Sequence, residues 1–281
     1  MQDLLELAVG ATASGCVYGL VALAYLLILR PTGIINFAVG EWAMVGAFGG
    51  HFLLSRYEWP YALGMVTVIA FLCALGWVTE RIAVRPLAER GAPVLAPILA
   101  LLGVLVITRE AISVSFPPDP LPVPYAFGIQ YQKYFIIAVT LAVFIGAWCF
   151  FEKTVWGKSF EAVALERKAA ALMGINLPRV TALSFAGGAG AAGLAGLLVA
   201  PNVSAHYLMG VPLAIQGFTA LVIGGVGRVE GALLGGLLLA FAEQLTVRYA
   251  PIPGGYAQGV PLLLLIVFLL IRPTGLLRAR A

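Results

Sequence analysis

Charge is the scarcest property of this sequence. Asp, Glu, Lys and Arg make up 11% of its 281 residues, against about 25% in soluble domains, while 61% are hydrophobic. A soluble fold would need a far larger polar surface to cover so many apolar side chains. The mean hydropathy of +0.99 likewise indicates a protein of the lipid bilayer. The composition therefore argues against a soluble domain, and membrane topology explains the net charge of +4 better than nucleic-acid binding does.

Cysteine, histidine and recognisable catalytic patterns are also scarce. Cys16, Cys73 and Cys149 lie in apolar runs without metal or redox spacing, so we expect them to be packing residues. The two histidines lie near expected membrane boundaries, and no carboxylate pair, metal cluster or Ser/His/Asp set is placed for catalysis. The phosphate-binding pattern G-x-x-x-x-G-K-[ST] does not occur either. The sequence therefore does not predict an enzyme.

Long apolar runs, by contrast, are abundant. A bilayer core about 30 Å thick needs about 20 helical residues, and nine runs are candidate spans. They are Leu4–Leu29, Ile34–Leu54, Trp59–Thr79, Val94–Val114, Tyr134–Phe151, Val180–Ala200, Leu213–Val226, Val229–Val247 and Gly259–Ile271. The seventh and ninth are short, so each is a candidate for a broken or re-entrant segment. We expect an all-α membrane protein, a single transmembrane domain over residues 1–281 built as a bundle of about eight to nine membrane segments.

Basic residues are distributed unevenly between the turns that join these runs. With the N-terminus outside, all but four of the 17 Lys and Arg residues fall on the inner side, including Arg272, Arg278 and Arg280 near the C-terminus. The four outer ones are Arg56, Arg109, Lys133 and Arg248. Because Lys and Arg are enriched in cytoplasmic loops, the sequence predicts an outer N-terminus and a cytoplasmic C-terminus.

One long hydrophilic stretch, at about residues 152–179, interrupts the apolar sequence. Its five basic residues are Lys153, Lys158, Arg167, Lys168 and Arg179. A cytoplasmic segment of this kind is typical of a contact with a soluble partner. We expect a short helix around Lys168–Met173 that ends at Gly174. The alternative is a solvated basic loop without a partner.

The run Gly33–Glu41 is the strongest local signal. It places Asn36 and Glu41 in a segment that is otherwise apolar as far as Leu54. A helix starting at Gly33 would put Glu41 on the order of 12 Å into the bilayer. An ionisable group at that depth is costly and indicates a functional residue. The alternative is a structural glutamate that is hydrogen-bonded to a neighbouring helix or to broken backbone.

A second signal lies in the stretch 217–228, where closely spaced glycines disfavour a regular helix. Irregular backbone at membrane depth is tolerated around a cavity or against protein, and broken helices form substrate sites in transporters. A tight turn before the next span is the alternative. We expect the two signals to face each other across a translocation pathway. Its predicted residues are Asn36, Phe37, Gly40 and Glu41 on one side and Thr219, Gly224, Gly225 and Gly227 on the other. Glu110 and Glu243 are expected to be packing or interface carboxylates instead.

Small residues also recur four positions apart in several spans. The sets are Gly15/Gly19, Gly46/Gly50, Gly188/Ala192/Gly196 and Gly227/Gly231/Gly235. On a helix such residues form a flat stripe that lets two backbones approach closely. The sequence therefore predicts a tightly packed bundle.

Five sequence blocks resemble a known family. They are RPTGIINFAVGEWAMVGAF, ERIAVRPLAERGAPVLAPILA, KAAALMGINLPRV, ALVIGGVGRVEGALLGG and LIRPTGLL. Together, from about Gly19 to Leu277, they resemble the membrane permease subunits of branched-chain amino acid ABC importers. The cytoplasmic motif of ABC permeases is partly matched. Ala169-Ala170 and Gly174 fit it, whereas Lys168 stands where Glu is usual and a Leu-Pro pair follows sooner.

The resemblance implies a bacterial inner-membrane importer of five parts: two homologous permeases, two ATP-binding subunits and a periplasmic binding protein. The chain would hold no cofactor, because ATP and Mg would be bound by the ATPase subunits. The expected ATPase contacts are Lys168, Ala169, Ala170, Gly174 and Asn176. The implied substrate is a branched-chain or other small, largely apolar amino acid. Urea, amides and small aromatic or carboxylic acids are alternative substrates, and a secondary transporter or channel is the alternative class.

Overall fold

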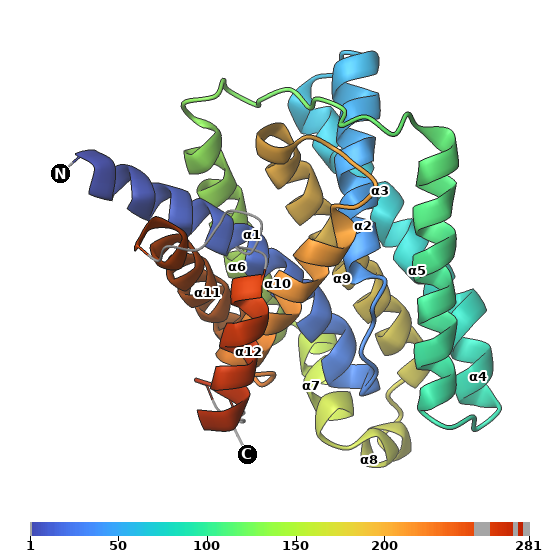
Figure 1. Cartoon of the computed structure of the whole chain (residues 1–281). Helices are drawn as coiled ribbons and strands as arrows, with labels where there is room; N and C mark the ends of the chain where they lie inside the picture. Colours follow the sequence, from blue (N-terminus) through green and yellow to red (C-terminus); the bar gives the residue numbers. More distant parts are fainter. Residues whose placement is uncertain (1, 250–258, 272–274, 278–281) are drawn as a thin grey trace.

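The computed structural model describes residues 2–249, 259–271 and 275–277, and the predicted basic residues Arg272, Arg278 and Arg280 lie outside this part. Within it the chain folds into helices joined by loops, with a single isolated β-bridge and no strand (Figure 1). The predicted all-α class is therefore confirmed for the described residues.

The helices follow one another in this order: α1 (Gln2–Thr32), α2 (Val39–Gly50), the π-helical η1 (His51–Arg56), α3 (Tyr61–Thr79), the π-helical η2 (Glu80–Val84), α4 (Arg85–Glu89), α5 (Leu95–Ser115), α6 (Gln132–Lys153), α7 (Val155–Leu165), α8 (Arg167–Leu172), α9 (Leu177–Val203), α10 (Gly210–Gly224), α11 (Val229–Tyr249) and α12 (Val260–Ile271).

Each predicted span contains a helix, but the helices differ in length. Six in the described part are long and apolar enough to cross a membrane: Glu6–Thr32, Tyr61–Glu89, Leu95–Ser115, Gln132–Lys153, Leu177–Val203 and Val229–Tyr249. Helices α2, α10 and α12 have only 12, 15 and 12 residues. The predicted count of eight to nine membrane segments is therefore not confirmed. Two of the short helices, α10 and α12, are those predicted from the short seventh and ninth runs.

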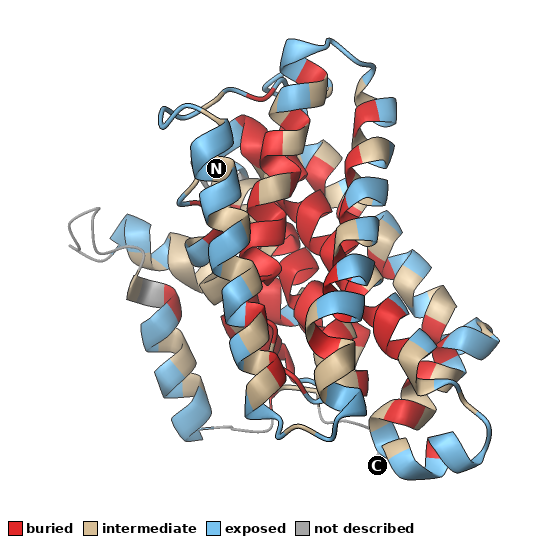
Figure 2. Cartoon of the chain, turned by 90° about the vertical axis from the view of Figure 1, so that its right-hand side faces the viewer, coloured by how far each residue is buried: buried red, intermediate tan, exposed pale blue. Residues whose placement is uncertain are grey.

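Helices α1 and α9 form the core of the bundle. In their most hydrophobic windows 72% and 78% of the residues are buried, against 11% in α5 at the periphery. Figure 2 shows the buried residues concentrated in the interior helices. The predicted close packing is confirmed at these helices. A Cβ atom on Gly46 of α2 would collide with the Gly193 backbone of α9, and one on Gly236 of α11 would collide with Gly15 of α1.

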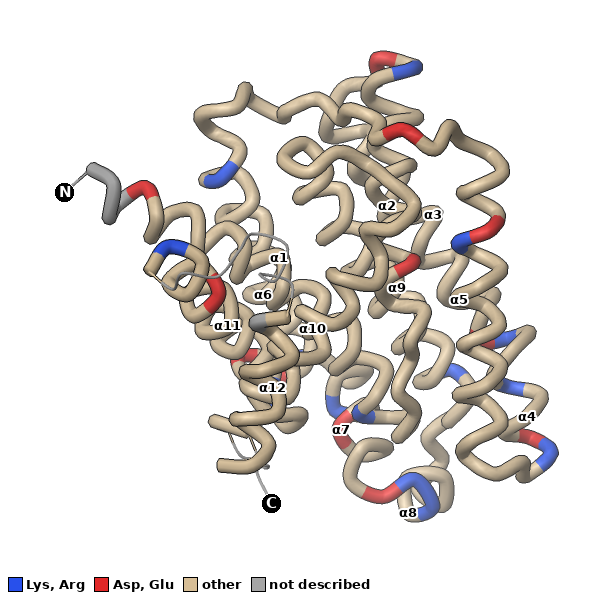
Figure 3. Tube along the Cα trace, viewed as in Figure 1, with Lys and Arg blue, Asp and Glu red and all other residues tan. Residues whose placement is uncertain are grey.

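The two ends of the bundle differ in charge. Helices α4, α7 and α8 lie at one end, at the bottom of Figure 1, which we call the α8 end. Most Lys and Arg residues gather there (Figure 3). The opposite end, the loop end, carries the α5–α6 connection. That connection is held by paired backbone hydrogen bonds of 2.8 Å between Leu121 and Ala205 and by Ser55 Oγ, which donates to the Pro122 carbonyl at 3.0 Å.

Candidate functional site

Glu41 is paired with Arg109, a partner that the sequence did not indicate. Glu41 lies in the first turn of α2 with only 1% of its surface exposed, and the Arg109 guanidinium of α5 donates to its Oε1 atom. Arg109, expected among the outer basic residues, thus reaches into the bundle and compensates a buried carboxylate. This contact is the one that a structural glutamate requires. A role for Glu41 in the translocation pathway stays a prediction.

The Glu41 carboxylate also lies beside the N-terminal end of α10. A Cβ atom on Gly210, the first residue of α10, would be 2.8 Å from Glu41 Oε2, and one on Gly40 would collide with the Gly210 carbonyl. A helix N-terminus favours negative charge because its first N–H groups are free. The two glycines therefore bring the carboxylate close to the positive end of α10.

Asn36 lies in the loop formed by residues 33–38 rather than in a helix. Its Oδ1 atom accepts a hydrogen bond of 2.9 Å from the Ala38 backbone N–H, so the side chain shapes the turn that precedes α2. The helix expected to start at residue 33 therefore begins only at Val39, and the depth of Glu41 in the bilayer stays a prediction. Asn36 is buried, whereas Phe37 is 43% exposed.

The glycine-rich stretch forms the tight turn that was the alternative to a broken helix. Helix α10, with buried Thr219 in its second half, ends at Gly224, and Gly225 has a φ of +94°, which favours glycine. The end of α10 is completed by the C-terminal segment, since the Leu276 N–H donates to the Ile223 carbonyl at 2.9 Å.

Neither of the two larger cavities in the described part of the chain, both beside α1, is lined by Asn36, Glu41, Thr219 or the stretch 224–227. Gly224 packs instead on the backbone of Gly231 in α11, and Gly225 lies against Gly275. Gly40 and Glu41 also contact α10, but at its opposite end, beside Gly210. The pathway role of these residues stays a prediction.

The predicted short helix in the hydrophilic stretch is present. Helix α8 spans Arg167–Leu172, Glu166 accepts a hydrogen bond from the Lys168 N–H at 3.2 Å at its start, and Gly174 ends it with a φ of +84°. Ala170 is buried. Lys168, Ala169, Gly174 and Asn176 are exposed, and Leu172 and Met173 are 88% and 82% exposed. The α8 end thus presents an apolar tip beside basic residues.

A cluster of acidic and basic residues lies on neighbouring α7 and the end of α6. Lys158 Nζ lies 3.1 Å from Glu161 and 3.4 Å from Glu152, and its hydrogen bond to Glu161 raises the pKa of the lysine. Lys158 therefore stays charged at neutral pH, but its charge is largely compensated. The exposed Lys168 of α8 is the more available cation at this end.

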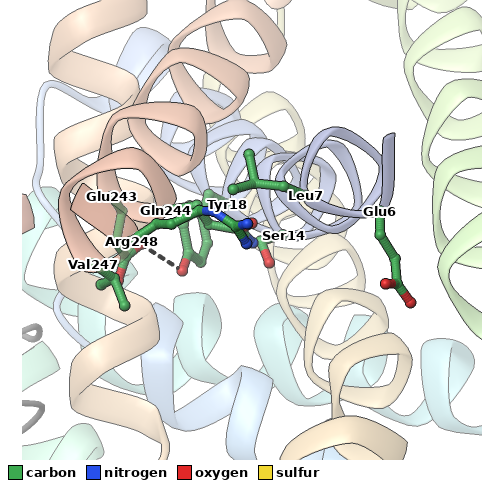
Figure 4. A pocket seen from close by; sticks show the side chains of 8 residues that line it. All are labelled: Glu6, Leu7, Ser14, Tyr18, Glu243, Gln244, Val247 and Arg248. Carbon is green, nitrogen blue, oxygen red and sulfur yellow. Dashed lines mark hydrogen bonds between the residues drawn. The ribbon is translucent and has the colours of Figure 1, made fainter. Parts of the chain in front are cut away.

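A polar cluster that the sequence did not predict lies between α1, α10 and α11. The Tyr18 hydroxyl donates to Glu243 Oε2 at 2.8 Å, and Gln216 Nε2 donates to Glu243 Oε1 at 3.5 Å. Figure 4 shows Tyr18, Glu243, Gln244 and Arg248 at a cavity of about 540 Å³, which Glu6 of α1 also lines. The only signal in the sequence was a carboxylate inside an apolar run, because Tyr18 and Glu243 are 225 positions apart.

Comparison with known proteins identifies the family. Residues 7–269 match the family model described as "Branched-chain amino acid transport system / permease component". The chain belongs to this family. It is 31% identical over 287 residues to the high-affinity branched-chain amino acid transport system permease protein LivH of Escherichia coli K12, covering 94% of this chain and 92% of LivH.

Two further relatives define how far the similarity extends. The permease BraD of Pseudomonas aeruginosa, named for the same type of system, is 32% identical over 97% of this chain and 95% of its own. The ribose import permease RbsC of Haemophilus influenzae is 25% identical over 81% of this chain and 73% of its own. Related permeases are thus named for different solutes.

A solved structure matches the fold. PsaBC from Streptococcus pneumoniae, in complex with Fab, aligns with a TM-score of 0.54 at 12% identity, over 94% of this chain and 91% of that one. At this identity the likeness concerns the fold alone.

Proposed function

We propose that this chain is the transmembrane permease subunit of a binding-protein-dependent ABC importer for branched-chain amino acids. The observation that carries the proposal is the similarity to LivH and BraD over nearly the whole of all three chains. In this assembly the chain forms the translocation pathway together with a second homologous permease. Two ATP-binding subunits and a periplasmic binding protein complete the importer.

The surface at the α8 end supports a coupling role. A short helix that ends at Gly174 and exposes Leu172 and Met173 has the shape and chemistry to enter an apolar groove of an ATPase subunit. ATP and Mg would be bound by that subunit. The chain then acts as a transport subunit rather than as an enzyme, in a bacterial inner membrane with the N-terminus outside and the α8 end in the cytoplasm.

The function is tested by reconstituting the complete importer in proteoliposomes that contain ATP. Leucine uptake that requires both the binding protein and hydrolysable ATP is the expected result. Uptake without ATP, driven by an ion gradient, would instead indicate a secondary transporter. Uptake of urea, amides or small carboxylic acids in place of leucine would keep the ABC mechanism and change the substrate.

Replacing Gly174 by Val tests the coupling surface. The left-handed backbone at this position disfavours a β-branched residue, so the end of α8 must shift and the ATPase subunits should co-purify at no more than one-tenth of the normal yield. Gly128 is the matched control, because it also has a positive φ, of +89°, and no atom within 4 Å of an added Cβ, but lies at the loop end. Gly128→Val should retain the ATPase subunits. Normal co-purification of the Gly174→Val variant would contradict the assignment.

A further inference from the structure

The cavity between α1 and α11 contains a carboxylate that lacks a cationic partner. Glu243 is hydrogen-bonded only by the neutral donors of Tyr18 and Gln216. Within the described part of the chain, no Lys, Arg or His nitrogen lies within 4.0 Å of it. Glu41, by contrast, is compensated by Arg109.

This arrangement lies at membrane depth. Tyr18 is halfway along the span Glu6–Thr32, and Glu243 lies about 9 Å from the end of α11. A carboxylate in this setting is costly and is typical of a site for an ion or a polar solute. Its two oxygens offer about four acceptor positions, of which Tyr18 and Gln216 use two. The remaining acceptor positions suit a small cationic group such as an ammonium.

The same cavity also offers a cation and an apolar surface. Arg248 lines it five residues beyond Glu243, which corresponds to an axial separation of about 7–8 Å. The ammonium and carboxylate groups of a free amino acid each form charge-assisted hydrogen bonds of about 2.8 Å with groups of opposite charge. Leu7 and Val247 line the cavity as well and provide apolar contacts. The volume of about 540 Å³ is within the range of small-molecule sites, about 300–1,000 Å³.

We propose that this cavity is a binding site for a zwitterionic aliphatic amino acid on its way through the permease. Glu243 receives the α-ammonium group, Arg248 receives the α-carboxylate, and Leu7 and Val247 contact the aliphatic side chain. Tyr18 is a positioning residue that orients the Glu243 carboxylate. The site rests on the proposed function, since it specifies where that importer would hold its substrate within the membrane.

Binding is tested directly with a reporter thiol. Ser14, which lines the cavity, is changed to Cys in a variant whose three native cysteines are replaced by Ala or Ser, and its reaction with a methanethiosulfonate reagent is timed in the purified importer. Leucine should slow the reaction at least fivefold. Isoamylamine, which lacks the carboxylate, and 4-methylpentanoate, which lacks the ammonium, should not. Ser113→Cys on exposed α5 is the matched reporter and should not respond to leucine.

The role of the charge is tested with Glu243→Gln, which keeps the size of the side chain. Protection of the reporter by leucine should be lost, and leucine uptake should fall at least tenfold, while ATPase subunits stay bound. Tyr18→Phe should raise the leucine concentration needed for half-maximal protection a few-fold and retain the maximal uptake rate. Glu110→Gln, which changes an exposed carboxylate of α5, is the control and should leave both readouts unchanged.

The two measurements separate the site from the function. ATP-dependent leucine uptake by the unmodified importer tests the proposed function, whereas protection of the reporter tests the site. An importer that takes up leucine but shows no protection, equal protection by both analogues, or full protection in the Glu243→Gln variant would overturn the site and keep the function. The analogue comparison needs no change at Glu243, so misfolding of that variant would not obscure the result.

Discussion

Two carboxylates of the bundle, Glu41 and Glu243, have different neighbours. Glu41 is buried and paired with Arg109, so its charge is already compensated inside the protein. Glu243 has only neutral donors and faces a cavity. The first arrangement joins α2 to the peripheral helix α5, and the second leaves a charge available to a solute.

The Glu41–Arg109 pair should matter more when one partner is removed than when both are. Arg109→Gln leaves a buried carboxylate uncompensated, which should cost about 3–5 kcal/mol and lower the melting temperature of the purified protein. The double variant Glu41→Gln/Arg109→Gln should recover most of that loss, because no charge remains to be compensated.

Leucine uptake by the same double variant decides between the two roles of Glu41. Near-normal uptake would show that the charge serves only the ion pair. Stability that recovers without uptake would show that the Glu41 charge also acts in the translocation pathway, as the sequence predicts. Equal destabilisation of the single and the double variant would contradict the ion-pair argument.

At the scale of the helices, glycines determine which elements pack at the centre. Helices α2 and α9 approach so closely that added Cβ atoms on Gly46 and Gly196 would collide with the backbones of Gly193 and Ala43. Helix α5 has no such contact at Gly103, where an added Cβ would meet no atom within 4 Å. Close backbone contact at small residues therefore distinguishes the core helices α2 and α9 from the peripheral helix α5.

This contrast predicts opposite effects of one chemical change. Gly46→Ala should destabilise the protein by about 1–3 kcal/mol, because the two backbones must move apart. Gly103→Ala should leave stability unchanged or raise it by up to about 1 kcal/mol, because alanine favours helix and nothing obstructs it. Thermal unfolding of the two variants in the same detergent measures the difference. A loss of stability at Gly103 as large as that at Gly46 would show that the contact is not the cause.

At the scale of the whole molecule, the asymmetry of charge predicts the orientation. The α8 end carries most of the basic residues (Figure 3), and such residues favour the cytoplasmic side. In a variant without native cysteines, Leu172→Cys at the α8 end should react with an impermeant maleimide only after the cells are permeabilised. Phe127→Cys at the loop end should react in intact spheroplasts, since 69% of Phe127 is exposed. The reverse labelling pattern would invert the orientation and remove α8 from the ATPase side.

Local chemistry was sufficient to predict where most helices lie and where α8 ends. Apolar runs of sufficient length indicate helices in a bilayer, since backbone groups in lipid must be hydrogen-bonded within the segment. Gly174 ends α8 where expected, because a left-handed residue stops a helix and glycine adopts that conformation at little cost. The glycine pairs on α2 and α9 could be predicted as contact surfaces for the same local reason.

The sequence by itself thus determined the class, the helices and their close-packing surfaces, whereas only the tertiary structure decided which side chains meet. Asn36 was expected in a span but lies in a turn. Arg109 was counted only for its side of the membrane, and its partner Glu41 lies 68 positions away in the sequence. Glu243 meets Tyr18 and Gln216 from two other helices. Hydropathy reports how each segment interacts with lipid, but it does not specify the rotation and order of helices in the bundle. Those depend on packing between segments far apart in the chain, and they determine where polar groups converge.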